Sequence, residues 1–199
     1  MMELIESELK FTFNDSWTNI IKFDESESFD KIKQITGTKA VDFVGIKNNS
    51  LYFIEVKNER NNKQITIADL LNKLTEIEKK ITHCKTINNN EEMLIKNINE
   101  IGQKVKDSLA LIIGVNCISQ SSKYFLDYKQ ILCCDKPNIK IILWNENNWI
   151  NLPKKDKLSN DILNKQLKKK LLWFTKYIFI NTTTRHNTET FGFTVEPIV

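Results

Sequence analysis

Long apolar stretches, CxxC motifs and clustered histidines are all missing from this chain of 199 residues. No apolar run approaches the roughly 20 residues that a helix needs to cross a bilayer, so no membrane-spanning segment is expected. The acidic start is short of apolar residues, which argues against a secretory signal. With 41% hydrophobic and 27% charged residues, the composition is that of a soluble globular protein, and we expect it in the cytoplasm.

The scarce cysteines and histidines do not suggest a metal or redox site. Reduced, mostly buried thiols are the expected state of cysteines in a cytosolic protein, with a disulfide or a zinc site left open as alternatives. His83 and His186 are isolated from each other, and neither has a partner at a spacing typical of a general base or a metal ligand. The four cysteines are Cys84, Cys117, Cys133 and Cys134.

The net charge of +4 is small, but the charges are unevenly distributed along the chain. Residues 1–30 carry eight acids against two lysines, whereas residues 153–176 carry eight lysines against two acids. A basic segment opposed to an acidic one hints at a polyanionic partner on one side of the protein.

Apolar periodicity predicts alternating helices and strands, with no internal repeat and no long linker. We therefore expect one α/β domain over residues 1–199, with a core at about 24–144 and a helix-strand extension at about 153–199. Helices are predicted at about 26–35, 66–81, 91–107, 123–133 and 161–173. Strands are predicted at 10–13, 17–23, 109–115, 139–144, 177–180 and 191–195, in addition to a hairpin over 39–57.

The hairpin is the most informative stretch. Asn48 and Asn49 tolerate the left-handed backbone of a tight turn, and a turn there opposes Ile46 with Leu51 and Val44 with Phe53.

The same register opposes Asp42 with Glu55 and Ala40 with Lys57. Two directly paired carboxylates repel each other unless a proton or a cation lies between them, and Lys57 shares the face of Glu55 because side chains alternate along a strand. Charge within apolar strands is costly without a function. The pattern predicts a divalent-metal site with an amine beside it.

Asp42, followed after twelve residues by Glu55-Val56-Lys57, resembles the PD-(D/E)xK nuclease superfamily, which has the restriction-endonuclease-like fold. Family members place an Asp on one strand and a (D/E)-x-K tripeptide on its hairpin partner, followed by helices and further strands. One departure is Val41, where the family motif has a proline. The resemblance implies a central mixed sheet flanked by helices.

The resemblance also implies roles for these residues. Asp42, Glu55 and the backbone carbonyl of Val56 would hold Mg²⁺, with Mn²⁺ as a substitute, and Lys57 would orient the attacking water or offset transition-state charge. Family nucleases often add an acid from the first helix, for which Glu27 is the preferred choice over Glu25 and Asp30.

Further residues are candidates for contacts with nucleic acid. Gln103 and Lys104 lie off the apolar stripe of the helix that passes the active site in related enzymes, although a plain polar helix surface is the preferred interpretation for both. Lys165, Lys168 and Lys169 lie on the lysine-rich helix, where they would contact phosphates without reading sequence, or would simply be solvated.

The expected function is hydrolysis of DNA phosphodiester bonds by a metal-dependent nuclease, with an endonuclease in prokaryotic defence or repair as the preferred form. The alternative is a non-catalytic nucleic-acid-binding or scaffold subunit with the same fold. A homodimer or a place in a larger complex is compatible with either function.

Overall fold

The computed structural model describes residues 1–27, 29–30, 38–58, 88–118, 123–146, 164–182 and 186–198. Three strands come first, β1 (Met2–Glu6), β2 (Leu9–Phe13) and β3 (Trp17–Lys22), followed by the hairpin strands β4 (Phe43–Lys47) and β5 (Ser50–Asn58). Helices α3 (Asn88–Ile118) and α4 (Lys123–Leu132) precede strand β6 (Ile139–Glu146). A helix over 164–171, strand β7 (Tyr177–Asn181), the short helix α6 (Thr188–Phe191) and strand β8 (Phe193–Pro197) complete the described elements.

The central sheet has five strands in the order β3-β4-β5-β6-β7. Strands β3, β4 and β5 form an antiparallel meander, whereas β6 and β7 run parallel to β5, so the sheet is mixed as predicted. It takes strands from 17–22 and 177–181, outside the core expected at about 24–144. A second, antiparallel sheet has the order β1-β2-β8 and joins the two ends of the described chain.

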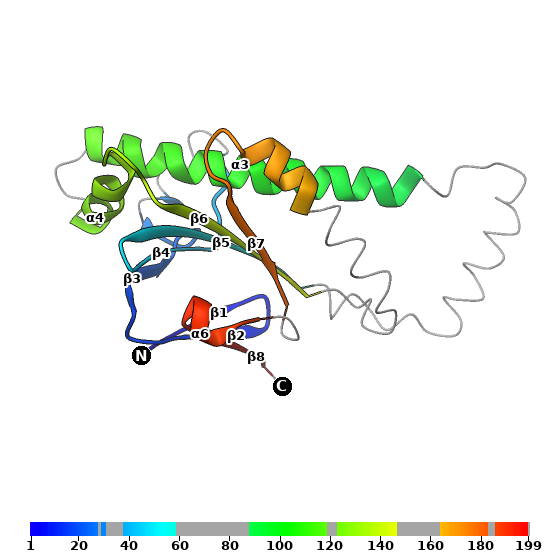
Figure 1. The fold of residues 1–199 in the computed structure, drawn as a ribbon, viewed down its shortest axis with the longest axis horizontal. Coiled ribbons are helices and arrows are strands. Elements are labelled where there is room, and N and C mark those ends of the chain that lie inside the picture. Colours follow the sequence, from blue (N-terminus) through cyan, green and yellow to red (C-terminus); the bar gives the residue numbers. More distant parts are fainter. Residues whose placement is uncertain are drawn as a thin grey trace, which may run out of the picture.

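The molecule has three layers, with helices on one face of the central sheet and the small sheet on the other (Figure 1). Apolar side chains of α3 and α4, such as Ile101 and Tyr128, pack with Phe53 on the helix side. Aromatic side chains, such as Phe11 and Trp144, fill the space between the two sheets. The central sheet is therefore covered on both faces, and its apolar strands are almost wholly buried.

The β4–β5 hairpin has the predicted turn. Asn48 and Asn49 both have positive φ, at 49° and 55°, which matches the tight turn whose twist suits two antiparallel strands. The register pairs Ile46 with Leu51 and Val44 with Phe53, which confirms the predicted alignment near the turn.

The predicted strand over 109–115 is wrong, because these residues belong to α3. A short apolar run fits a buried helix as well as a strand, and nothing in the sequence interrupts the helical pattern that precedes it. Leu111 and Ile112 are buried while Ile113 is 42% exposed, so the run has one buried side only.

The remaining predictions have mixed outcomes. Helix α4 and strands β6 and β7 are confirmed, whereas the predicted helix over 66–81 lies outside the described residues. The sequence also favours Trp144, Trp149 and Trp173 as core residues rather than stacking platforms. Trp144 is buried and Trp149 lies outside the described residues, but Trp173 is 63% exposed. Cys133 and Cys134 are exposed free thiols rather than buried ones. Among the described helices, none has an apolar stretch long enough to cross a bilayer.

Candidate functional site

The chain leading into β4 is held against α3 rather than paired with β5. The N–H of Lys39 donates to Asp107 Oδ2, and the N–H of Val41 donates to Ser108 Oγ, both at 3.0 Å. Ladder pairing of β4 with β5 therefore begins only at Phe43. The prediction that Asp42 pairs with Glu55 and Ala40 with Lys57 in the β-ladder is therefore wrong. The backbone before Phe43 is hydrogen-bonded to side chains of α3 instead.

The side chain of Asp42 lies beside β5 at the point where β4 is no longer paired with it. Its Oδ2 accepts a hydrogen bond from the N–H of Val56 at 2.6 Å, and the residue is only 5% exposed. Because the N–H and C=O of one strand residue point to the same side, the Val56 carbonyl is expected to face the same gap as this carboxylate. This placement suits Val56 as a backbone ligand.

Glu55 lies on the α3 side of the central strand and is fully buried. Its Oε1 is 2.8 Å from Lys104 Nζ and 3.1 Å from Lys57 Nζ. Lys104 Nζ also lies 3.8 Å from Asp42 Oδ1, so this amine links the two carboxylates. In the part of the chain that the structure describes, Glu55 Oε2 has no hydrogen-bond partner.

Glu100 completes the charge network one helical turn before Lys104. Its Oε1 lies 3.6 Å from Lys57 Nζ and 3.9 Å from Lys39 Nζ. Sequence reasoning missed Glu100, although the four-residue spacing that puts it beside Lys104 on one flank of α3 was readable.

The network shifts the pKa values of its members. Burial raises the pKa of Asp42 to about 8, the nearby Glu55 adds to the rise, and Lys104 and the Val56 N–H oppose it. Burial alone would lower the pKa of Lys104, but Glu55 and Asp42 outweigh burial and raise it. For the carboxyl of Glu100, burial alone would raise the pKa. The lysines around it, Lys57 foremost, outweigh burial and lower the pKa of Glu100.

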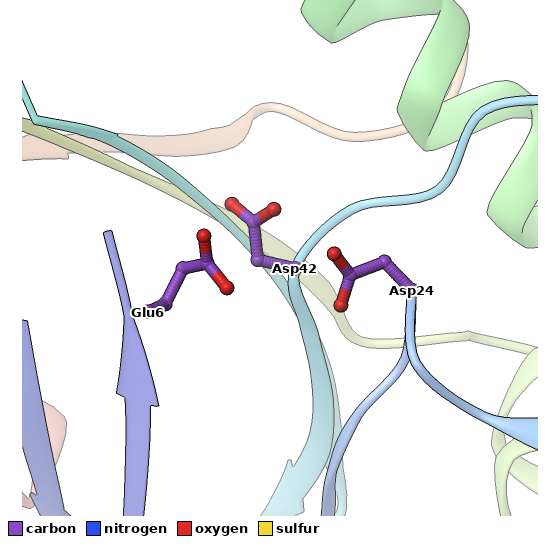
Figure 2. A group of neighbouring side chains, drawn as sticks. All are labelled: Glu6, Asp24 and Asp42. Carbon is purple, nitrogen blue, oxygen red and sulfur yellow. The ribbon is translucent and has the colours of Figure 1, made fainter. Parts of the chain in front are cut away.

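A second group of acids meets at Asp42. Ligand atoms of Glu6, Asp24 and Asp42 all lie within 4.8 Å of one another, and the side chains come from three segments of the chain (Figure 2). Burial raises the pKa of Asp24 to about 6, with Glu6 adding to the rise. Lys22 Nζ lies 3.0 Å from Glu6 Oε2 and offsets part of the charge.

The other predicted residues are not members of the group formed by Glu6, Asp24 and Asp42 in the part of the chain that the structure describes. Glu27 is exposed and is not a member of the acidic group, whose extra acids are Asp24 and Glu6. Gln103 donates to Asp107 Oδ1 at 2.6 Å, so it supports the segment before β4. Lys165, Lys168 and Lys169 are exposed on the helix over 164–171.

Sequence reasoning therefore found Asp42, Glu55 and Lys57, which the structure brings together, but missed Glu6 and Asp24 as well as Glu100. Glu6 and Asp24 are distant in sequence from the hairpin, and no motif links them to it; the acid-rich start of the chain was the only pointer. A scan against family models and searches of curated proteins and of solved structures found no match.

Proposed function

We propose that this protein is a divalent-metal-dependent nuclease that hydrolyses phosphodiester bonds in DNA. The observation that carries the proposal is Glu55, a fully buried carboxylate on the central strand with one oxygen unpaired among the described residues. An unpaired buried oxygen is costly, and its cost is recovered when a ligand occupies the site.

The order of elements around the site supports membership of the PD-(D/E)xK superfamily. Asp42 directly precedes β4, and Glu55 and Lys57 lie on its hairpin partner β5. Helix α3 and the parallel strand β6 follow, which is the strand-hairpin-helix-strand order that the resemblance implies.

The donor set fits magnesium or manganese. Asp42, Glu55 and the Val56 carbonyl would hold the ion, since hard cations of this kind prefer oxygen ligands and take few protein carboxylates. Glu6 and Asp24, whose ligand atoms lie close to that of Asp42, are further residues that would hold a cation. When bound, the ion supplies a Lewis acid for the phosphoryl oxygen and lowers the pKa of a bound water.

The two lysines have separable roles. Lys57, whose side chain is 27% exposed, is placed to orient an attacking water or to stabilise charge that develops on the phosphate. Lys104, at 17% exposure, holds Glu55 and Asp42 together and offsets their charge before a cation enters.

The proposal predicts cleavage of plasmid or linear DNA in the presence of Mg²⁺ or Mn²⁺ and none with a chelator. Asp42→Asn, Glu55→Gln and Lys57→Ala should each reduce the cleavage rate by at least about 100-fold, because each removes a ligand or a charge at the reacting phosphate. Gel assays on circular and linear, single- and double-stranded substrates measure the rate and separate internal from terminal cutting.

Lys10→Ala is the matched control and should leave the rate unchanged, because this half-exposed strand lysine pairs with Glu3 on the small sheet. Activity that survives both Asp42→Asn and Lys57→Ala would contradict the mechanism. Titration of Mn²⁺ into Glu55→Gln and Asp24→Asn then shows which of the acids near Asp42 hold the cation.

One observation favours a second candidate, a nucleic-acid-binding or scaffold module without turnover. The ammonium groups of Lys57 and Lys104 already lie within 3.1 Å of Glu55, so the acidic site is partly neutralised by the protein itself. Such a module would show no heat of Mn²⁺ binding in calorimetry, whereas the nuclease should bind the ion.

A further inference from the structure

The segment after the helix over 164–171 exposes large apolar side chains. Leu172 is 64% exposed and Trp173 is 63% exposed, although a tryptophan normally hides most of its surface. Phe174 anchors Trp173, with ring centroids 5.4 Å apart, and itself packs on Phe53 of the central strand. Trp173 is therefore an exposed ring on a fixed support.

Lysines surround this ring. Lys106 Nζ of α3 lies 6.0 Å from the centroid of the Trp173 ring, and Lys176 Nζ lies 5.3 Å from the centroid of Tyr177, itself 43% exposed. The exposed Lys168 and Lys169 precede the tryptophan, and residues 164–177 contain no acid. This combination of exposed aromatic rings and uncompensated positive charge defines the Trp173 surface.

The Trp173 surface and the carboxylates lie on opposite flanks of α3. Lys104 and Lys106 are two residues apart, which on a helix turns their side chains about 200° from each other. The Lys104 flank contacts Glu55, whereas the Lys106 flank contacts Trp173. The helix over 164–171, drawn in orange across α3 in Figure 1, also contacts α3 through Lys170 and Asn99.

We propose that the Trp173 surface binds single-stranded nucleic acid by stacking a base on Trp173 while the lysines contact the backbone. Exposed bases stack on aromatic rings irrespective of sequence, whereas the bases of a duplex are already stacked. A protein partner would gain from the lysines only if its own surface were acidic, whereas every nucleic acid carries the phosphates that the lysines contact. A helix is about 10–12 Å wide, so a strand held here reaches the carboxylates within a few nucleotides.

The test is fluorescence anisotropy with a labelled oligodeoxythymidylate of about 20 nucleotides, measured with a chelator so that no cleavage occurs. Trp173→Ala should weaken binding by about tenfold, whereas Trp173→Phe should keep most of the affinity because a ring remains. An oligomer of the same length without bases should bind Trp173→Ala and the unsubstituted protein equally. Leu126→Ala, at an exposed apolar residue of α4, is the control and should change nothing.

The lysines have their own readout. Lys168→Ser together with Lys169→Ser should reduce the slope of log affinity against log salt by about 0.7 for each phosphate that the protein no longer neutralises. Equal affinity of Trp173→Ala and the unsubstituted protein for oligodeoxythymidylate would overturn the inference. An equal loss of affinity of Trp173→Ala for the oligomer without bases would also overturn it. A third contrary outcome is a dimer, seen in sedimentation, that Trp173→Ala converts to a monomer without changing the affinity for DNA.

The inference deepens the proposed function by naming single strands as the substrate class, and it rests on that function only for the link to the carboxylates. Its failure and the failure of the nuclease proposal are distinguishable. Metal-dependent cleavage with unchanged binding by Trp173→Ala refutes the stacking surface alone, whereas Trp173-dependent binding without cleavage refutes the nuclease alone.

Discussion

Asp42 and Glu55 are acids that this protein buries almost completely, at 5% and 0% exposure. A buried carboxylate must be protonated, paired or bound to a cation, because the charge is otherwise poorly solvated. Glu55 is paired with two lysines, whereas Asp42 has the Val56 N–H and a more distant ammonium. Asp42 is consequently the residue whose charge state depends most on what else is present.

Asp42→Asn should stabilise the metal-free protein, and the gain should grow with pH. The folded-state pKa of Asp42, about 8, is above its ordinary value of 3.8, so the folded state binds more protons between these values. The stability contributed by protonated Asp42 is therefore complete below about pH 4 and is lost as the pH rises through about 8. The variant lacks this loss, while its amide oxygen can still accept from Val56.

Thermal unfolding with a chelator, followed from pH 5 to pH 9, measures the difference. The gap in Tm between the variant and the unsubstituted protein should widen with pH by about 2–4 °C or more, which corresponds to about 1 kcal/mol. Added Mn²⁺ should reverse the order, because only the unsubstituted protein keeps its ligand. A gap that is constant with pH would show that Asp42 is ionised throughout.

The residues of the site differ in how readable they were. Asp42, Glu55 and Lys57 lie on one hairpin, where strand alternation and turn position fix which side chains converge. Lys104 could be placed on a polar flank of its helix, but its contact with Glu55 depends on how α3 crosses the sheet. Glu6 reaches Asp42 only through the packing of the two sheets, which no local pattern encodes.

Helix α3 and the β4–β5 hairpin are the elements that build the site, and they were predicted with unequal success. The hairpin is determined locally, since Asn48 and Asn49 set the turn and hence the register. Helix α3 changes from a half-exposed to an apolar character along its length, so its apolar stretch over 109–115 was mistaken for a strand. Apolar composition alone does not distinguish a helix from a strand in such a short run, and the packing of the segment against the rest of the protein decides between them.

The turn supports a prediction about stability. Asn49→Ala should cost about 1–2 kcal/mol, because alanine incurs the steric penalty of a left-handed backbone at φ 55°. Urea denaturation followed by circular dichroism measures the loss. Asn49→Gly is the matched control and should be neutral or slightly stabilising, since glycine adopts this conformation freely. Equal losses for both variants would indicate that the asparagine side chain, rather than the backbone, matters.

On the scale of the whole molecule, the two interfaces of the central sheet differ in character. The helix side is mainly aliphatic, whereas the side facing the small sheet is built from aromatic rings that contact one another edge to face. Phe193 of β8 contributes to several of these contacts, including Phe13 and Trp144. The small sheet also supplies Glu6, so its packing affects the acidic group.

Phe193→Ala should destabilise the protein by about 3–5 kcal/mol, because removing a buried ring leaves a cavity between the sheets. Chemical denaturation measures this change, and the emission of the neighbouring Trp144 reports the repacking. Thr194→Ala, on the exposed face of the same strand, is the control and should change stability by no more than about 0.5 kcal/mol. A loss of stability with Thr194→Ala as large as that with Phe193→Ala would locate the effect in the strand backbone.

The pairing of β2 with β8 also has a consequence for the order in which the protein matures. Phe13 opposes Phe193, so the small sheet cannot close until residues 193–197 have left the ribosome. Contacts between such distant parts of the chain form late, because a very long loop must close first. The nascent chain can therefore form the hairpin and α3 while β8, the third strand of the small sheet, is still missing. The small sheet, which supplies Glu6, is therefore complete only after β8 has been synthesised.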